Sequence, residues 1–201
     1  AGKNGTFLLD KNALHIWPRG EFMLIALANL DGSFTVTLFL PHSNSAYSFS
    51  ELNTDEKVSN FFQKQFPDAL ELMPNLIDEF QNNPVGNLGT IKCSPWSYKG
   101  KTLLIGDAAH AVVPFYGQGM NASFEDVYVL DQYIEKYEGD WSKILIEYEK
   151  ERKKNADAIG DLAVENFYEM RDHVANPTFK KKRQIEMELE TNHPYYSKYS
   201  M

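Results

Sequence analysis

The chain has 201 residues, of which 43% are hydrophobic and 24% are charged, and its formal net charge is −8. This composition is typical of a soluble globular protein and excludes disordered and collagen-like chains. The acidic balance also argues against nucleic acid as a partner, because phosphate-binding surfaces need clustered cations.

Several single features narrow the class further. The one cysteine, Cys93, excludes an internal disulfide and a multi-thiolate metal site, and we expect a buried, inert thiol. The five histidines lack zinc-site spacing, so we expect no metal. The longest apolar runs, 22–28 and 108–115, are shorter than the roughly 18 residues that cross a bilayer. The basic cluster 180–183 is interpreted as a solvated helix face, with an anionic membrane surface as the alternative.

Residues 6–40 favour β-strands. We expect strands at Phe7–Leu9, Leu14–Trp17, Phe22–Ala28 and Phe34–Leu40, with Asp31-Gly32 as a hairpin turn between the last two. The last run mixes β-branched and aromatic residues with a period of two, as in a strand with one face against a core. An antiparallel sheet is therefore the first architectural prediction.

The composition then becomes helical. Residues 53–56 offer an N-cap and acidic first-turn residues for one helix, and a second is expected over 68–80, bent or restarted at Pro74. Short strands are expected at Thr90–Cys93 and Lys101–Ile105, and helices from Gly117 onward. Aromatic residues in this last region are interpreted as core packing: Phe124, Tyr128, Tyr133 and Tyr137.

Residues 103–122 carry the chemical signal. They predict a buried strand, a sharp turn at Gly106-Asp107, an irregular loop and a glycine-flanked start of a long helix. Glycines on both sides of Gln118 would let the backbone approach a flat ligand, and the helix N-terminus would favour negative charge. Asp107 could accept hydrogen bonds from ligand hydroxyls. The alternative is structural: Asp107 as a turn cap, flexible loop glycines, and His110 as a hydrogen-bonded supporting group.

The complete motif favours the ligand-binding interpretation of these residues over the structural one. Residues 106–110, Gly-Asp-Ala-Ala-His, followed by Pro-x-x-Gly-Gln-Gly-x-Asn at 114–121, resemble the second flavin-binding motif of the class A flavoprotein monooxygenases. The resemblance implies that Asp107 contacts the ribityl chain of FAD and that residues 117–122 aim amides at the pyrimidine edge of the flavin. The cofactor-binding residues it implies are Gly106, Asp107, Pro114, Gly117, Gln118, Gly119, Met120, Asn121 and Ala122.

Further runs, at 14–19, 25–27, 31–39, 114–121 and 165–171, resemble the branch of this family that hydroxylates L-kynurenine. This implies an FAD- and NADPH-dependent monooxygenase of tryptophan catabolism and NAD biosynthesis, which makes 3-hydroxykynurenine from L-kynurenine and O2 through a flavin hydroperoxide. No catalytic side chain is assigned. The substrate-binding residues it implies are Leu14, Met23, Ile25, Leu27, Phe39, Pro114, Phe115, Tyr116, Gln118, Asn166, Glu169 and Met170.

Two of these assignments can be compared with residue spacing. Asn166 and Glu169 are three residues apart, which places them on one face of a helix. On the sheet, alternation allows either the face of Phe22, Leu24 and Ala26 or the face of Met23, Ile25 and Leu27 as a pocket wall. The resemblance selects the second.

We therefore expect a mixed α+β and α/β fold. Residues 1–93 would form an antiparallel substrate-domain sheet with covering helices. Residues 94–140 would be the returning part of a Rossmann-like FAD domain, with the Gly-Asp motif and the flavin-facing helix, and residues 141–201 a C-terminal helical region.

The family's first nucleotide motif, Gly-x-Gly-x-x-Gly, does not occur in the chain. Residues 1–5 lack an initiator Met and a signal-peptide core, so this start is interpreted as an internal cut. We expect the partner to be a missing N-terminal half of the same enzyme, and the chain alone to be inactive. Resemblance to eukaryotic members implies the cytosolic face of the mitochondrial outer membrane, through a segment absent here.

Two other functions remain open at this point. One is a related flavin hydroxylase that acts on another aromatic acid. The other is a non-catalytic α+β interaction module with an acidic surface and an incidental glycine loop.

Overall fold

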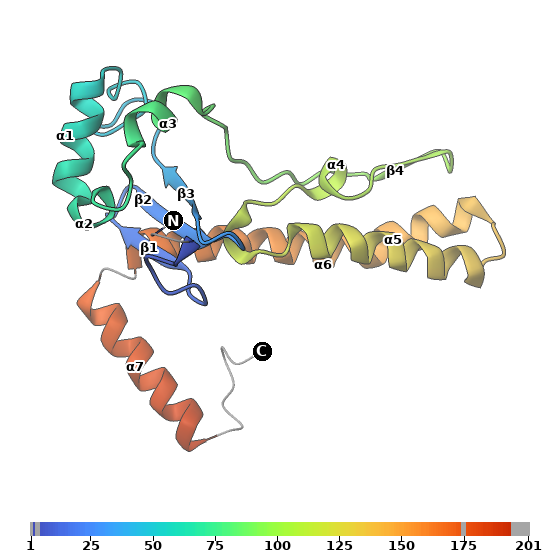
Figure 1. Cartoon of the computed structure of the whole chain (residues 1–201). Coiled ribbons are helices and arrows are strands. Elements are labelled where there is room, and N and C mark those ends of the chain that lie inside the picture. The colour runs from blue at the N-terminus through green and yellow to red at the C-terminus, as the bar shows by residue number, and fades with distance from the viewer. Residues whose placement is uncertain (1, 3–4, 174–175, 194–201) are drawn as a thin grey trace. The chain divides into compact units, whose positions relative to one another are not determined.

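The computed structural model describes residues 2, 5–173 and 176–193 (Figure 1). Parts of both termini quoted above, Ala1, Lys3 and Asn4 among them, lie outside the described residues. The chain divides into two compact units, one of residues 1–85 and 169–201 and the other of residues 86–168. This differs from the three-part division expected from the sequence, because the residues after 168 group with the N-terminal unit.

The first unit contains a three-stranded sheet. Strands β1 (His15–Pro18), β2 (Met23–Ala28) and β3 (Phe34–Phe39) lie in the order β1-β2-β3, and both pairs are antiparallel, as predicted. Gly32 has φ +85°, and a β-carbon there would collide with the Gly5 carbonyl, so the turn before β3 requires glycine. The strand expected at Phe7–Leu9 is wrong: this run lies outside the ladder, and Phe7 packs its ring edge-on against Phe34 at 6.2 Å.

Three helices follow the sheet in this unit: α1 (Asp55–Gln65), α2 (Pro67–Leu70) and α3 (Leu76–Asn82). The predicted N-cap is confirmed, because the Thr54 hydroxyl accepts a hydrogen bond from the Lys57 amide. The second predicted helix is restarted, as α2 and α3, on either side of Pro74.

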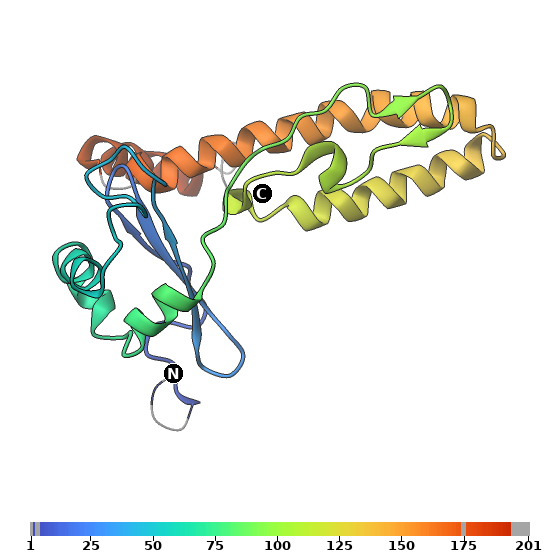
Figure 2. The ribbon, with the colours of Figure 1, turned by 90° about the horizontal axis from the view of Figure 1, so that it is seen from above.

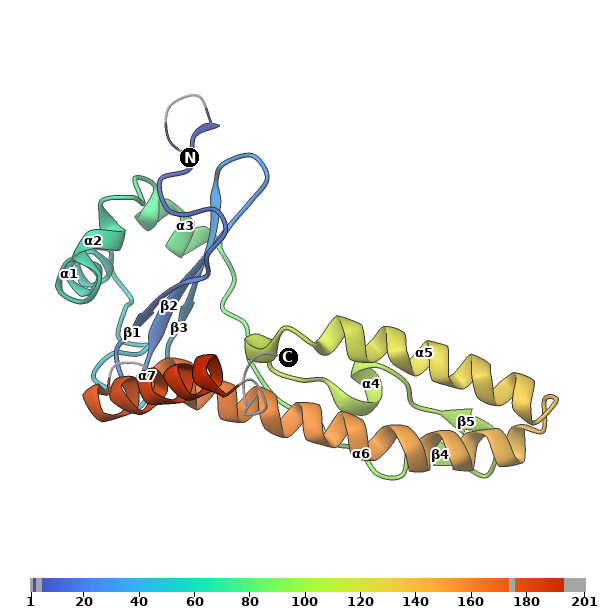
Figure 3. The ribbon, with the colours of Figure 1, turned by 90° about the horizontal axis from the view of Figure 1, so that it is seen from below.

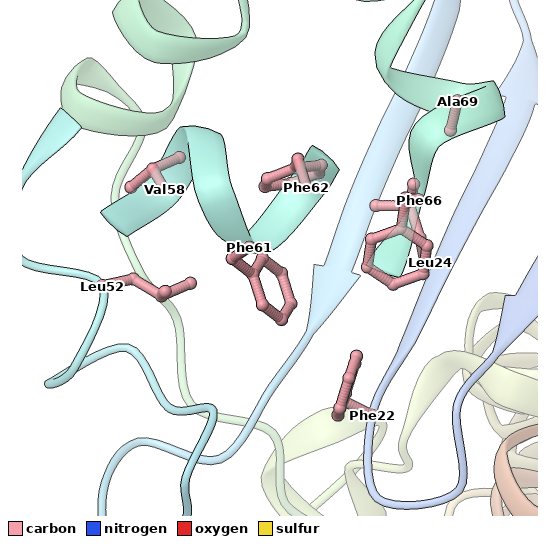
Figure 4. Close-up of a cluster of buried hydrophobic side chains, with 8 residues drawn as sticks. All are labelled: Phe22, Leu24, Leu52, Val58, Phe61, Phe62, Phe66 and Ala69. Carbon is pink, nitrogen blue, oxygen red and sulfur yellow. The ribbon is translucent and has the colours of Figure 1, made fainter. Parts of the chain in front are cut away.

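Figure 4 shows the core that joins these helices to one face of the sheet. Leu24 lies in β2, and Phe22 is the residue just before that strand. Both meet aromatic side chains of the α1–α2 region. Phe62 and Phe66 are almost fully buried there, at 2% and 0% exposure. The buried members are Phe22, Leu24, Leu52, Val58, Phe61, Phe62, Phe66 and Ala69.

The second unit is built on two long helices, α5 (Gly119–Lys136) and α6 (Trp141–Tyr168). They run side by side in opposite directions, and the preceding segment lies along them (Figures 2 and 3). That segment holds β4 (Ser97–Tyr98) paired with β5 (Thr102–Leu103), α4 (Asp107–His110) and the short 3-10 turn η2 (Pro114–Tyr116).

The strand predicted at Thr90–Cys93 is wrong. The run forms no regular strand, although the amides of Ile91 and Cys93 donate to the carbonyls of Ala111 and Ala109 at 2.7 and 3.2 Å. Two isolated hydrogen bonds hold it against the later segment without a continuous ladder. The strand expected at Lys101–Ile105 is present as the two residues of β5.

A second core lies beneath this segment, formed by Trp96, Ala109, Val129, Tyr148 and Ala156. The predicted aromatic core stripe is wrong for Phe124 and Tyr128, which are 66% and 63% exposed, because they lie on a different face of α5 from Val129. Tyr133 is partly buried and packs against this core, and the ring of Tyr137 stacks on the ring of Tyr133. Cys93 is partly buried, not fully.

The remaining elements belong to the first unit. A π-helical turn, η3 (Glu169–His173), follows α6 in the chain, and α7 (Pro177–Asn192) begins where the Asn176 side chain caps the amides of Thr178 and Phe179. None of the side chains of α7 is buried, and the basic cluster 180–183 lies on it. Within the part of the chain that the structure describes, no helix has both the length and the hydrophobicity to cross a membrane.

Replacing Phe66 with alanine tests the first core. Because the ring is fully buried among other aromatic side chains, Phe66→Ala should lower the free energy of unfolding by about 3–5 kcal/mol. The exposed Phe124 is the control, and Phe124→Ala should change it by less than about 0.5 kcal/mol. Urea denaturation measures both, and equal effects of the two substitutions would contradict this assignment of the core.

Candidate functional site

A tight turn at Gly106 directs the chain from β5 into α4. Gly106 has φ 60° and ψ −143°, a conformation that essentially only glycine adopts. A β-carbon at this position would also lie 3.3 Å from the Ser123 hydroxyl. Asp107 follows as the first residue of α4, with an exposed side chain. The turn therefore presents a carboxylate to the outside at a position that the backbone fixes.

A second turn prepares the start of α5. The 3-10 turn η2 ends at Gly117, which is left-handed with φ 66°, and the Gly117 amide donates to the Pro114 carbonyl at 3.0 Å. No atom lies within 4 Å of the place where a β-carbon of Gly117 would be. The glycine therefore leaves open space beside the backbone at the helix entrance.

The start of α5 offers backbone donors. Gln118 is the N-cap residue, its carbonyl accepts from the Ala122 amide at 2.8 Å, and no side chain caps the helix. The Asn121 side chain instead donates to the Gln118 side-chain oxygen at 3.0 Å. The first turn contains no acidic residue. The amides of residues 119–121 have no carbonyl one turn earlier within the helix, so this end suits a negatively charged or electron-rich group.

A buried charged cluster lies behind both turns. The Asp126 carboxylate, 0% exposed, accepts from the Gly106 amide at 3.0 Å, from Arg152 Nε at 2.8 Å and from His110 Nε2. Arg152, 1% exposed, also pairs with Glu125 at 2.8 Å. The Asp126 carboxylate therefore binds both the Gly106 turn and Arg152 of α6.

The charges in this cluster stabilise one another. Burial by itself would raise the pKa of Asp126, but hydrogen bonds from His110, Arg152 and the Gly106 amide outweigh it and the pKa is lowered. Burial would likewise lower the pKa of Arg152, and the carboxylates of Asp126 and Glu125 reverse this. Burial, with the nearby negative charge of Asp126, raises the pKa of Tyr148, so this phenol stays neutral.

A neighbouring carboxylate holds the segment that contains β4. Glu149 of α6 accepts from the amides of Trp96 and Ser97, at 3.0 and 2.9 Å, and from the Ser97 hydroxyl at 2.7 Å. The Trp96 ring then packs on His110, with ring centres 5.2 Å apart. The cluster and this segment therefore support each other.

The structure brings several of the predicted substrate residues of the second unit together. The Asn166 side-chain amide donates to the Phe115 carbonyl at 2.5 Å, and the rings of Phe115 and Phe167 lie 4.6 Å apart. Phe115 is buried, whereas Tyr116 is 45% exposed. Asn166 therefore supports the η2 turn, a role that its spacing in the sequence did not indicate.

The predicted residues on the sheet share one face. Met23 lies directly opposite Phe39, and Ile25 and Leu27 alternate with Leu24 and Ala26 along β2. Leu14 is the residue just before β1, and by the same alternation it falls on this face of the sheet. Met23 and Ile25 are buried, and Leu14 and Leu27 are about half exposed, at 47% and 51%.

Glu169 and Met170 lie in η3, where the α-helical period ends. The prediction that Asn166 and Glu169 share a helix face assumed a continuous α-helix, which ends at Tyr168. Glu169 lies 3.9 Å from Arg183 of α7, and Met170 is buried. Among the described residues no group of three or more His, Cys, Asp or Glu side chains could hold a metal ion.

Residues 50–163 match a family model described as an FAD binding domain, which is more than half of the chain. The chain belongs to this FAD-binding domain family. It is 51% identical over 215 aligned residues to "Kynurenine 3-monooxygenase" of Dictyostelium discoideum, covering 100% of this chain and 46% of that protein. It is 53% identical over 194 residues to the protein of the same name in Flavobacterium johnsoniae, covering 96% of this chain and 43% of that protein.

The chain thus spans less than half the length of these relatives. A solved structure, that of tetracycline destructase Tet(51), covers 91% of the chain and 49% of its own length, with a TM-score of 0.54 and 16% identity. At that identity the likeness concerns the fold alone. The resemblance to the kynurenine-hydroxylating branch of the family is confirmed by the two named relatives.

Sequence reasoning missed the cluster behind the FAD-binding motif. Asp126 and Arg152 are 26 residues apart, on two helices whose charged residues look like ordinary surface positions. The sequence held no direct signal for this pair, because Arg152 of α6 meets Asp126 of α5 only once the two helices pack. The hydrogen bond of His110 to Asp126 agrees with the supporting role that the sequence offers as the alternative for His110.

Lowering the pH should remove the stability that the Asp126 carboxylate contributes to the folded chain. The pKa of Asp126 in the folded protein lies below its ordinary value of 3.8, so the unfolded chain takes up the proton first. The stabilisation is present above that value and is lost as pH falls through the folded pKa. Urea unfolding at a series of acidic pH values should show a steeper loss of stability for the native chain than for Asp126→Asn. Asp131→Asn, at an exposed position of α5, should keep the native slope, and equal slopes for all three would contradict the prediction.

Proposed function

We propose that this chain supplies the isoalloxazine-facing part of the flavin site in an FAD- and NADPH-dependent monooxygenase that converts L-kynurenine to 3-hydroxykynurenine. The observation that carries the proposal is the identity of 51% and 53% to kynurenine 3-monooxygenases over nearly the whole chain. The turns at Gly106 and Gly117 and the uncapped start of α5 give it a structural basis.

The residues present fit FAD. The open space beside Gly117 would admit a flat ring close to the backbone, since no β-carbon or neighbouring atom occupies it. The exposed Asp107 carboxylate can accept hydrogen bonds from ribityl hydroxyls, and the α5 amides can donate to the pyrimidine edge. In this role the contact residues are Gly106, Asp107, Pro114, Gly117, Gln118, Gly119, Met120, Asn121 and Ala122.

FAD reduced by NADPH would supply the electrons that activate O2 for transfer of one oxygen atom to the substrate ring. The start of α5 would stabilise negative charge on the pyrimidine edge, because its first amides have no carbonyl acceptor within the helix and its first turn has no carboxylate. The kynurenine ring is already activated ortho to its amino group, so the chain needs no nucleophile or general base. Its side chains orient the substrate and exclude water.

We assign the substrate contacts as follows. Phe115, Tyr116 and Met170 would lie beside the aromatic ring, and Asn166 and Glu169 would contact the amino-acid end. Because Asn166 already donates to the Phe115 carbonyl, it would also fix the aromatic contact. The apolar wall would come from Leu14, Met23, Ile25, Leu27 and Phe39, with Pro114 and Gln118 near both ligands.

The test is a complete enzyme in which the part of the F. johnsoniae relative that precedes the matched region is joined to this chain. The purified protein should retain FAD, seen by its visible absorbance, and should oxidise NADPH faster when L-kynurenine is added. The chain alone should show no such stimulation. Stimulation by a phenolic acid and none by kynurenine would contradict the substrate, and absence of flavin would contradict the proposal as a whole.

In that enzyme Asp107→Ala should weaken FAD binding by about ten- to hundredfold in Kd, which corresponds to a loss of about 1.5–3 kcal/mol for hydrogen bonds to a charged group. Asp131→Ala, which removes an exposed carboxylate from α5, is the matched control and should leave the Kd unchanged. Fluorescence titration of the apoenzyme with FAD measures both. An equal Kd for Asp107→Ala and the unaltered enzyme would contradict the assigned role of Asp107.

A further inference from the structure

One buried side chain, Arg152, is linked to both segments that the proposed function places against the flavin, to one directly and to the other through Asp126. The first is the turn at Gly106-Asp107, and the second is the opening turn of α5 at residues 118–122. They are separated by a loop of irregular backbone and have no regular secondary structure in common. The distance between the two segments therefore depends on side-chain contacts.

Arg152 of α6 makes that connection, and all three of its guanidinium nitrogens have a partner. Nε donates to Asp126 Oδ1 at 2.8 Å, Nη1 pairs with Glu125 at 2.8 Å, and Nη2 donates to the Ala122 carbonyl at 3.2 Å. The second oxygen of Asp126 accepts from the Gly106 amide at 3.0 Å. A chain of two hydrogen bonds thus leads from Arg152 to the first segment, and one leads directly to the second.

We propose that Arg152 is a positioning residue that sets the distance between the Asp107 carboxylate and the α5 amides, and so sets the affinity and environment of the bound flavin. The inference rests on the proposed function. Arg152 donates directly to the Ala122 backbone carbonyl, and it reaches Gly106 through Asp126.

The geometry requires a guanidinium and not merely a positive charge. The planar group holds five N–H donors on three nitrogens in fixed directions, which lets one side chain reach Asp126, Glu125 and Ala122 together. A lysine ammonium at the same place could stay beside the two carboxylates but would be a single point of charge. It would compensate Asp126 without also holding the Ala122 carbonyl.

Burial makes the connection rigid. Arg152 and Asp126 are 1% and 0% exposed, so water cannot replace a lost bond without rearrangement of the core. His110 occupies a further position on Asp126 and is itself packed under Trp96. A displacement of the guanidinium should therefore pass to both flavin-facing segments, and small misplacements of binding groups have large effects.

The test compares Arg152→Lys, Arg152→Met and Lys150→Met in the complete enzyme described above. Lys150 lies on the exposed side of α6, two residues from Arg152, and serves as the matched control. Arg152→Lys should keep most of the stability in urea, because it leaves a cation beside Asp126. It should nevertheless bind FAD about tenfold or more weakly and change the visible circular dichroism of the bound flavin. Lys150→Met should match the unaltered enzyme in all three measurements.

The outcomes separate this inference from the proposed function. If the unaltered enzyme holds FAD and Arg152→Lys binds it equally well with the same dichroism, the positioning role is overturned and the proposed function stands. If the unaltered enzyme holds no FAD, both are overturned. Arg152→Met leaves Asp126 without its buried partner, so its failure to fold is compatible with the inference while Arg152→Lys folds. Failure of both variants to fold would make Arg152 a core residue only and would overturn it.

Discussion

A carboxylate at Asp126 that is completely buried is the constraint on which the second unit depends. An ionised group in the interior is strongly destabilising unless it is fully hydrogen-bonded. Arg152, His110 and the Gly106 amide meet this need and hold the carboxylate in its charged form. Because these partners come from α6, α4 and the turn before α4, satisfying one charge fixes three parts of the chain relative to α5.

The same logic explains how a segment with little regular structure can carry a binding motif. Residues 86–118 contain two strands of two residues each and two short helical turns. Their backbone is held largely by side chains of α6: Glu149 binds the amides at Trp96 and Ser97, and Asn166 binds the Phe115 carbonyl. The long helix therefore acts as the support, and the irregular segment is free to present glycine backbone and the Asp107 carboxylate.

The sequence predicted those features that depend on local geometry. Strands β2 and β3 and their turn follow from alternation and from Gly32, and the start of α1 follows from Thr54. The turns at Gly106 and Gly117 were predictable because backbone with a positive φ angle favours glycine, and the glycines are visible in the sequence. The strands expected at Phe7–Leu9 and Thr90–Cys93 failed, because strand formation depends on a partner that a local pattern does not show. The Asp126–Arg152 pair was missed for a related reason, since its two charges are adjacent only after α5 and α6 pack.

The most direct test of the account is an experimental structure of the complete enzyme with FAD bound. We predict Asp107 within about 2.7–3.2 Å of a ribityl hydroxyl, and amides of residues 119–121 at a similar distance from the pyrimidine edge of the flavin. A flavin held elsewhere, with those amides and the Asp107 carboxylate facing water, would contradict it.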